Sequence, residues 1–167
     1  MIVEKPGKKI AYFHASKFGN GEKVAEEFQR LMADRGVEVE VRHIAHARAK
    51  DMPYADLYLF SAPGRMGKPR GKMRRFLRRA NLPAGTRCAV LTTEGAPRPD
   101  PKTGKMPDPA AAEKWQRVIP VMLKILEAKG LKCVAEGKVL VTGMKGPLEE
   151  EWERKVAAYV DKLAPQV

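Results

Sequence analysis

A short polar turn near the start of the chain carries the residue types that bind a phosphate group. It spans residues 16–21 and reads Ser-Lys-Phe-Gly-Asn-Gly. Ser16 offers a hydroxyl, Asn20 offers an amide, and the backbone N–H groups of such a turn are not used by a strand or a helix. Gly19 and Gly21 allow left-handed or crowded backbone conformations and a close approach to a ligand. These residue types predict an anion site.

The segments on either side of the turn position it for that chemistry. Residues 10–13 form an apolar run that is typical of a buried strand, and apolar residues recur at helical spacing from Val24 to Met32. A strand, a tight turn and a helix direct free N–H groups and the positive end of the helix dipole at one point. The alternative is a Gly-rich turn that binds nothing, because such turns occur throughout α/β folds.

The rest of the chain repeats the order of strand and then helix. The third helical pattern, over residues 115–126, contains Pro120, which predicts a kink or a break in that helix. Repeated β-then-α units predict an α/β fold in three layers, with a doubly wound five-stranded parallel sheet. We expect one domain over residues 1–167. The further strands are predicted over residues 37–42, 56–61, 88–93 and 133–141 (interrupted around 136–137), and the further helices over residues 70–80, 115–126 and 148–163.

Ligands of such sheets bind outside the carboxyl ends of the strands. Three loops gather there in the predicted fold, namely residues 16–21, 62–69 and 93–109. The third loop is rich in proline from Glu94 to Pro109, so we expect it to be long and irregular. The strand over residues 37–42 alternates apolar and charged residues, which predicts a place at or near an edge of the sheet.

The composition excludes several classes of protein and of site but does not identify a ligand. No apolar run approaches the roughly 18–20 residues that span a bilayer, and the N-terminus shows no signal pattern, so we expect a cytoplasmic protein. Cys88 and Cys133 fit no zinc or redox spacing, which favours buried free thiols. His14 ends the first strand, where we favour a structural histidine, and His43 and His46 are expected at the surface. No metal site is predicted.

Positive charge is concentrated in and before the second predicted helix. The chain has a net charge of +12. The pairs Arg74/Arg78 and Arg75/Arg79 each cost a few tenths of a kcal/mol through like-charge repulsion, which favours an anionic partner over a merely solvated face. Nucleic acid is disfavoured, because no exposed aromatic residues alternate with the cations and no nucleic-acid motif is present. The basic residues of this cluster are Arg65, Lys68, Arg70, Lys72, Arg74, Arg75, Arg78 and Arg79.

Three stretches resemble motifs of the flavodoxins and of the quinone-reductase-like branch of that superfamily. Residues 16–25 are similar to the phosphate loop of the family, Ser-x-Thr/Tyr-Gly-Asn/His-Thr followed by a helix. Residues 61–77 are similar to the second flavin loop, in which a strand ends in Pro before a Gly-containing turn. Residues 145–150 resemble the stretch before the last helix. The three motifs occur in the family's order along nearly the whole chain.

The resemblance implies the flavodoxin strand order 2-1-3-4-5 and noncovalent binding of FMN. It further implies electron transfer, or reduction of a small acceptor such as a quinone, with a redox protein or that acceptor as the partner. Whether the chain is a carrier or an FMN-dependent oxidoreductase stays open, as do its catalytic residues and its oligomeric state, with a dimer or tetramer among the alternatives. The implied cofactor-binding residues are Ser16, Lys17, Phe18, Gly19, Asn20, Gly21, Ala62, Pro63, Gly64, Arg65, Met66, Gly67, Thr93, Glu94 and Gly95.

The sequence departs from the family at several of these positions. Phe18 and Gly21 stand where the family often has threonine, and Gly64 and Met66 stand where bulkier or aromatic residues often line the flavin ring. The remaining aromatic candidates for the ring are Phe18, Tyr54 and Trp115, each of which also fits an ordinary core position. Typical flavodoxins present an acidic surface, which this chain does not. The alternative function is therefore a flavodoxin fold without flavin that acts as a basic interaction module for an acidic protein or another polyanion.

Overall fold

Five parallel strands form the central sheet of the molecule, a computed structural model that describes residues 7–167. The order β2-β1-β3-β6-β7 confirms the predicted order 2-1-3-4-5 of the main strands. The N-terminal residues 1–6, on which the expectation of no signal pattern rests, lie outside the described part. The strands are β1 Lys8–His14, β2 Val37–His43, β3 Leu57–Ser61, β6 Arg87–Gly95 and β7 Lys132–Val141.

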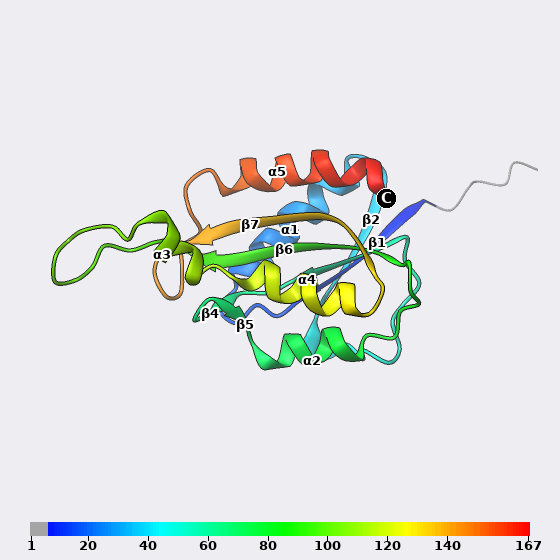
Figure 1. The fold of residues 1–167 in the computed structure, drawn as a ribbon. Helices are drawn as coiled ribbons and strands as arrows, with labels where there is room; N and C mark the ends of the chain where they lie inside the picture. Colours follow the sequence, from blue (N-terminus) through cyan, green and yellow to red (C-terminus); the bar gives the residue numbers. More distant parts are fainter. Residues whose placement is uncertain (1–6) are drawn as a thin grey trace, which may run out of the picture.

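Two helices cover each face of this sheet, which gives three layers (Figure 1). The helices α1 Asn20–Ala33 and α5 Trp152–Leu163 share one face, and α2 Gly71–Arg79 and α4 Val118–Ala128 share the other. Each face of the sheet has its own hydrophobic core. Alternate residues of a strand contribute to one core or the other, because successive side chains point to opposite faces of a sheet. In β1, for example, Tyr12 packs toward α1 and Phe13 toward α2.

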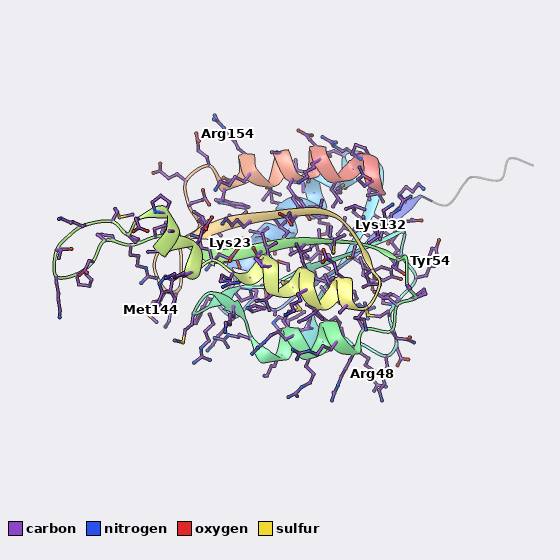
Figure 2. The ribbon with its side chains drawn as sticks, viewed as in Figure 1. Lys23, Arg48, Tyr54, Lys132, Met144 and Arg154 are labelled. Carbon is purple, nitrogen blue, oxygen red and sulfur yellow. The ribbon has the colours of Figure 1, made fainter. Side chains whose placement is uncertain are left out.

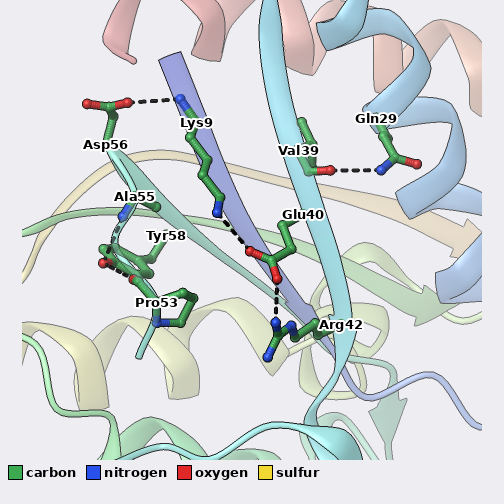
Figure 3. Close-up of polar contacts among 9 residues, drawn as sticks. All are labelled: Lys9, Gln29, Val39, Glu40, Arg42, Pro53, Ala55, Asp56 and Tyr58. Atoms are coloured by element: carbon green, nitrogen blue, oxygen red, sulfur yellow. Dashed lines mark hydrogen bonds and ion pairs between the residues drawn. The ribbon is translucent and has the colours of Figure 1, made fainter. Parts of the chain in front are cut away.

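The strand β2 lies at the edge of the sheet, as its alternating pattern predicts. Polar contacts tie it to its neighbours (Figure 3). Lys9 Nζ of β1 lies 2.9 Å from Glu40 Oε2, and Gln29 of α1 donates to the Val39 carbonyl at 2.7 Å. The hydrogen bond from Lys9 lowers the pKa of the Glu40 carboxyl, which Arg42 also contacts. These contacts hold the edge strand in register with β1.

The strand β7 is continuous, so the predicted interruption at residues 136–137 is wrong. Gly137 lies within the strand because the ring of Tyr159 packs directly on it, and a Cβ there would come within 2.7 Å of that ring. The register shift falls earlier, between Cys88 and Ala89 of β6. At that point the sulfur atoms of Cys88 and Cys133 lie 2.8 Å apart, both as free thiols. Cys88 is buried, whereas Cys133 is only half-buried.

The third predicted helix begins three residues later than expected, and a separate short helix precedes it. A short helix α3, Pro109–Lys114, ends before Trp115, and α4 begins only at Val118. Pro120 therefore lies in the first turn of α4, where its missing N–H needs no partner, and not at a kink. The predicted kink or break at Pro120 is wrong, because α4 runs without interruption from Val118 to Ala128. Trp115 is 61% exposed instead of packing in a helix face.

The remaining elements are short and lie around the sheet. No helix in residues 7–167 is both long and apolar enough to cross a membrane. The predicted irregular loop is shorter than expected, because β6 continues to Gly95 and α3 begins at Pro109, and residues 96–108 project as an exposed arm (Figure 1). The short elements are β4 Gly64–Arg65, β5 Lys68–Pro69 and the 3-10 helices η1 Ile44–His46 and η2 Ala164–Gln166.

Candidate functional site

A cavity of about 500 Å³ lies at the carboxyl ends of the strands, where the three predicted loops meet. Residues Gly19, Ala62, Gly67 and Glu94 do not line it. Five lining residues were not predicted, namely Arg70, Arg98, Val141, Gly143 and Met144. The predicted site residues that line it are Ser16, Lys17, Phe18, Asn20, Gly21, Pro63, Gly64, Arg65, Met66, Thr93 and Gly95.

The side chain of Ser16 organises the phosphate loop from within. Its buried hydroxyl oxygen accepts hydrogen bonds from the backbone N–H groups of Gly19 and Gly21, both at 3.2 Å. Gly19 has a φ of 91°, a left-handed conformation that favours glycine, and it directly precedes α1. A Cβ on Gly21 would lie 2.9 Å from the Cβ of Ser16. A larger residue at position 21 would therefore require Ser16 or the loop to shift.

Other groups of the same loop remain available to an anion. Within residues 7–167, the backbone N–H groups of Lys17, Phe18 and Asn20 have no protein acceptor. They lie just before or at the start of α1, where the helix dipole also favours negative charge. The hydroxyl proton of Ser16 is a further donor, since the hydroxyl oxygen only accepts in the two contacts described above. This donor set fits a phosphate.

Asn20 connects the phosphate loop to the turn before α5. Its Nδ2 donates to the Lys145 carbonyl at 3.1 Å. Gly146 has a φ of 114°, and a Cβ there would lie 2.9 Å from Asn20 Oδ1. The ammonium groups of Lys17 and Lys145 lie 5.3 and 5.6 Å from the centre of the Phe18 ring. The resembling segment at residues 145–150 therefore adjoins the phosphate loop and adds positive charge beside it.

Two histidines form hydrogen bonds with the backbone of the phosphate loop at Ser16. His14 is 4% exposed, and its Nδ1 accepts from the Ser16 N–H at 3.2 Å, which is the structural role predicted for it. Burial and then the nearby His43 lower the pKa of His14, although Glu22 opposes the shift. His43 Nε2 lies 2.9 Å from the Ser16 carbonyl oxygen. The prediction of a surface position holds for His46, whereas His43 is half-buried against the loop.

The second and third loops are joined to each other and to α4. The Thr93 N–H donates to the Ala62 carbonyl at 3.1 Å, so this N–H is not free for a ligand. Glu94 is 1% exposed, and its carboxylate accepts from the Val118 N–H at 3.0 Å and from the Thr92 hydroxyl at 2.8 Å. Glu94 thus caps the start of α4. No pattern in the sequence links it to Val118, which lies 24 residues away.

Gly67 also has a structural task. Its φ is 80°, and a Cβ there would lie 2.8 Å from the Lys114 carbonyl oxygen. The Gly67 carbonyl accepts from the Arg117 N–H at 2.8 Å, so the second loop is held against the junction of α3 and α4. Gly67 and Glu94 therefore support the cavity without lining it. Their predicted contact with a cofactor stays a prediction.

The cavity is positively charged and has apolar side chains at its mouth. Its charged lining residues are Lys17, Arg65, Arg70 and Arg98, and no carboxylate among residues 7–167 lines it. Met66 and Met144 line it and are 75% and 82% exposed, and Phe18 is half exposed. Large exposed apolar side chains around a concave site are typical of ligand binding.

The other two aromatic candidates lie outside this cavity. Tyr54 is exposed at the end of the molecule opposite Met144 (Figure 2), so it neither lines the site nor packs in the core. Trp115 lines an adjoining hollow with Gly64, Met66 and Arg98. Of the three aromatic candidates, only Phe18 lines the cavity itself.

No family model and no curated protein sequence matches the chain. Solved structures do match it. Flavodoxin 1 of Bacillus cereus, in its oxidised form, superposes with a TM-score of 0.72 at 19% identity over 96% of this chain and 99% of that chain. Flavodoxin 2 of the same organism gives 0.73 at 19% identity over 95% and 99%. The rubredoxin:oxygen oxidoreductase of Desulfovibrio gigas gives 0.63 at 15% identity over 97% of this chain but 36% of that one.

These matches, together with the strand order, define the class of protein by its fold. The chain has the flavodoxin fold, as the three sequence motifs predict. At 15–19% identity the agreement concerns the architecture alone.

Proposed function

We propose that the chain binds FMN noncovalently in the cavity at the carboxyl ends of the strands and acts in cytoplasmic electron transfer. The observation that carries the proposal is that a phosphate-type loop and four cationic side chains line one cavity, with no carboxylate from residues 7–167 beside them. A group with a phosphate at one end and a planar ring at the other matches this distribution of charged and apolar residues.

The residues present fit FMN in both chemistry and size. The free N–H groups of Lys17, Phe18 and Asn20 and the Ser16 hydroxyl suit the phosphate, and Lys17 adds a point charge. Phe18, Met66 and Met144 offer apolar contacts for the ring. The volume of about 500 Å³ falls within the roughly 300–1,000 Å³ of small-molecule sites. Bound FMN supplies one- and two-electron redox chemistry.

In this proposal the chain binds and orients the cofactor, and its partner is a redox protein or a small electron acceptor such as a quinone. The positive lining favours a negatively charged partner. The cations of α2 form no ion pair within residues 7–167, which favours a second candidate function, a basic interaction module that works without flavin.

The test is a titration of flavin-free protein with FMN and with riboflavin, which lacks the phosphate. We expect FMN to bind at least tenfold more tightly, and at about a hundred times its Kd to raise the free energy of unfolding by about 2.7 kcal/mol. Ser16→Ala should weaken FMN binding about tenfold, because the N–H groups of Gly19 and Gly21 lose their acceptor and the loop its order.

The binding of riboflavin should be unchanged in the same Ser16→Ala variant, because the effect acts through the phosphate. Asp34→Ala, which alters the far end of α1, serves as the matched control and should bind both flavins like the wild type. A colourless protein with no thermal shift at millimolar FMN would overturn the proposal in favour of the interaction module.

A further inference from the structure

A second hollow lies beside the FMN cavity and has a different composition. It has a volume of about 750 Å³ and lies between α2 and residues 43–51, which follow β2. It shares only Ser16, Lys17 and Arg70 with the FMN cavity. We call it the α2 groove. Most residues that line the α2 groove therefore belong to it alone, whereas Lys17 and Arg70 are cations of both sites.

The α2 groove is lined by seven cationic side chains and one carboxylate, Asp51. Lys72, Arg75 and Arg79 are spaced for one face of α2, along about 10 Å of helix. The opposite wall contributes Arg48 and Lys50, and Figure 2 shows Arg48 at the α2 side of the molecule. The seven cations are Lys17, Arg48, Lys50, Arg70, Lys72, Arg75 and Arg79.

None of these seven cations forms an ion pair within residues 7–167, where every ion pair involves other residues. The helix α2 itself contains no acidic residue. Asp51 is the one carboxylate of the groove among residues 7–167 against seven cations, so most of the repulsion among these cations is uncompensated and an anionic ligand would relieve it. Arginine predominates on the walls, and its planar guanidinium can form two parallel hydrogen bonds to one phosphate.

Small apolar side chains line the groove between its charged walls. On the segment after β2, Ala47 and Ala49 are half-buried and alternate with the exposed Arg48 and Lys50. Phe76 of α2 is buried at the same hollow and packs on Phe13, with ring centres 5.3 Å apart. This lining of alanine methyl groups beside the Phe76 side chain suits a flat aromatic group, which a bare polyanion would leave uncovered.

We propose that the α2 groove binds a nucleotide with at least two phosphates. The base lies on the alanine residues, and the phosphates lie against Lys72, Arg75 and Arg79. The volume is that of a small-molecule site, which favours a nucleotide over an acidic protein segment. This site is distinct from the proposed FMN site and does not depend on whether FMN binds.

The probe is ADP, titrated calorimetrically into the flavin-free 167-residue chain at about 0.15 M salt. The variant R75A/R79A removes two cations of the groove, and R78A/K124A removes two exposed cations of the same face that do not line it. We expect at least a tenfold rise in the Kd of ADP for the first variant and less than a threefold rise for the second. Equal losses in both variants would mean diffuse attraction to a basic surface and would overturn the proposal.

Two comparison ligands test the two halves of the site. ADP should bind at least tenfold more tightly than pyrophosphate and than adenosine, because only ADP uses both the cations and the apolar surface. If pyrophosphate binds as tightly as ADP, the groove is a simple anion site and the nucleotide assignment is wrong. If a glutamate-rich peptide binds more tightly than ADP, the occupant is an acidic protein segment, which also overturns it.

A competition experiment separates this proposal from that of the FMN site. Saturating FMN should leave the Kd of ADP within threefold, and R75A/R79A should leave the Kd of FMN within threefold. Loss of ADP binding on addition of FMN would place ADP in the FMN cavity and overturn the inference. ADP binding without FMN binding would overturn only the proposed function. Urea unfolding of each variant verifies that the exposed substitutions leave the fold intact.

Discussion

At the scale of single residues, the conformation of the phosphate loop depends on hydrogen bonds from its backbone N–H groups to two side chains, Ser16 and His14. Ser16 Oγ accepts the N–H groups of Gly19 and Gly21, and His14 Nδ1 accepts the N–H of Ser16. The His14 contact requires an unprotonated Nδ1. The loop is therefore sensitive to the charge of a buried histidine, and this sensitivity has a definite sign.

Acid should destabilise the protein through His14. Its folded pKa is lowered from the ordinary value of 6.5, mainly by burial, so the unfolded chain binds the proton more readily. The stabilisation is fully present above pH 6.5 and is lost as pH falls toward the folded pKa, at a slope of up to about 1.4 kcal/mol per pH unit. We expect His14→Asn, whose amide oxygen can accept from Ser16 without titrating, to lose this part of the pH dependence.

The measurement is urea unfolding of the wild type and His14→Asn at pH 7.5, 6.5, 5.5 and 5. The absolute stability of the variant will also reflect the smaller side chain, so the slope with pH is the informative quantity. His46→Asn is the control, because His46 is exposed. The same pH dependence in the wild type and His14→Asn would show that His14 does not couple protonation to folding.

Residue types indicated the phosphate loop from the sequence, because a hydroxyl, an amide and two glycines stand together between a strand and a helix. Residue types did not indicate Arg98 or Met144. Both come from segments without periodicity, so their direction depends on contacts distant in sequence, such as Asn20 with Lys145. The pairing of Cys88 with Cys133 was equally hidden, since it follows from strand register and not from spacing.

At the scale of elements, local patterns were misleading where packing against a distant element decides the structure. The apolar pattern that begins at Trp115 predicts one helix, but the buried Glu94 carboxylate binds the Val118 N–H and fixes the start of α4 there. Gly137 in β7 is a similar case. Glycine has a low propensity for strand interiors, so its presence predicts an interruption of the strand. The strand nevertheless continues, because Gly137 provides the space that Tyr159 occupies.

We therefore expect Gly137→Ala to destabilise the protein by about 1–3 kcal/mol through overpacking, although alanine is the better strand residue of the two. The added Cβ would meet the Tyr159 ring at 2.7 Å, and that ring is fixed because its hydroxyl donates to the Val90 carbonyl at 2.9 Å. Urea unfolding measures the change. Gly95→Ala on β6 is the matched control, since a Cβ there has open space, and it should cost less than about 0.5 kcal/mol.

A double-mutant cycle shows whether the proposed contact is the cause. In a Tyr159→Leu background the ring is gone, so Gly137→Ala should cost at least 1 kcal/mol less than in the wild type. An equal cost in both backgrounds would assign the effect to the backbone of β7 and contradict the packing argument.

At the scale of the whole molecule, the order and direction of the strands could be predicted because four of the five strands are followed by an α-helix, and a right-handed crossover leaves few topologies. The distribution of charge could be predicted only in part. The basic face of α2 is evident from its sequence, whereas its position opposite Arg48 and Lys50 depends on how residues 43–51 return along the sheet. The groove is therefore a property of the fold and not of a motif.

The arm over residues 96–108 is the part of the molecule that the fold needs least. Residues 99–106 are all exposed, and their turn is closed by its own hydrogen bonds, from the Asp100 N–H to the Lys105 carbonyl and from the Gly104 N–H to the Asp100 carbonyl, each at 2.8 Å. Replacing residues 99–106 by Gly-Ser-Gly-Ser should change the free energy of unfolding by less than about 1 kcal/mol, because no buried surface is lost and loop-closure entropy varies slowly with length.

The replacement retains Arg98, so the affinity for FMN should also stay within about threefold of the wild type in a flavin titration. A loss of more than tenfold in affinity with unchanged stability would instead mean that the arm folds over the bound ring as a lid. A loss of more than about 2 kcal/mol in stability would mean that the arm packs on the body of the protein in solution. Measured together, affinity and stability assign the arm to ligand binding, to the fold or to neither.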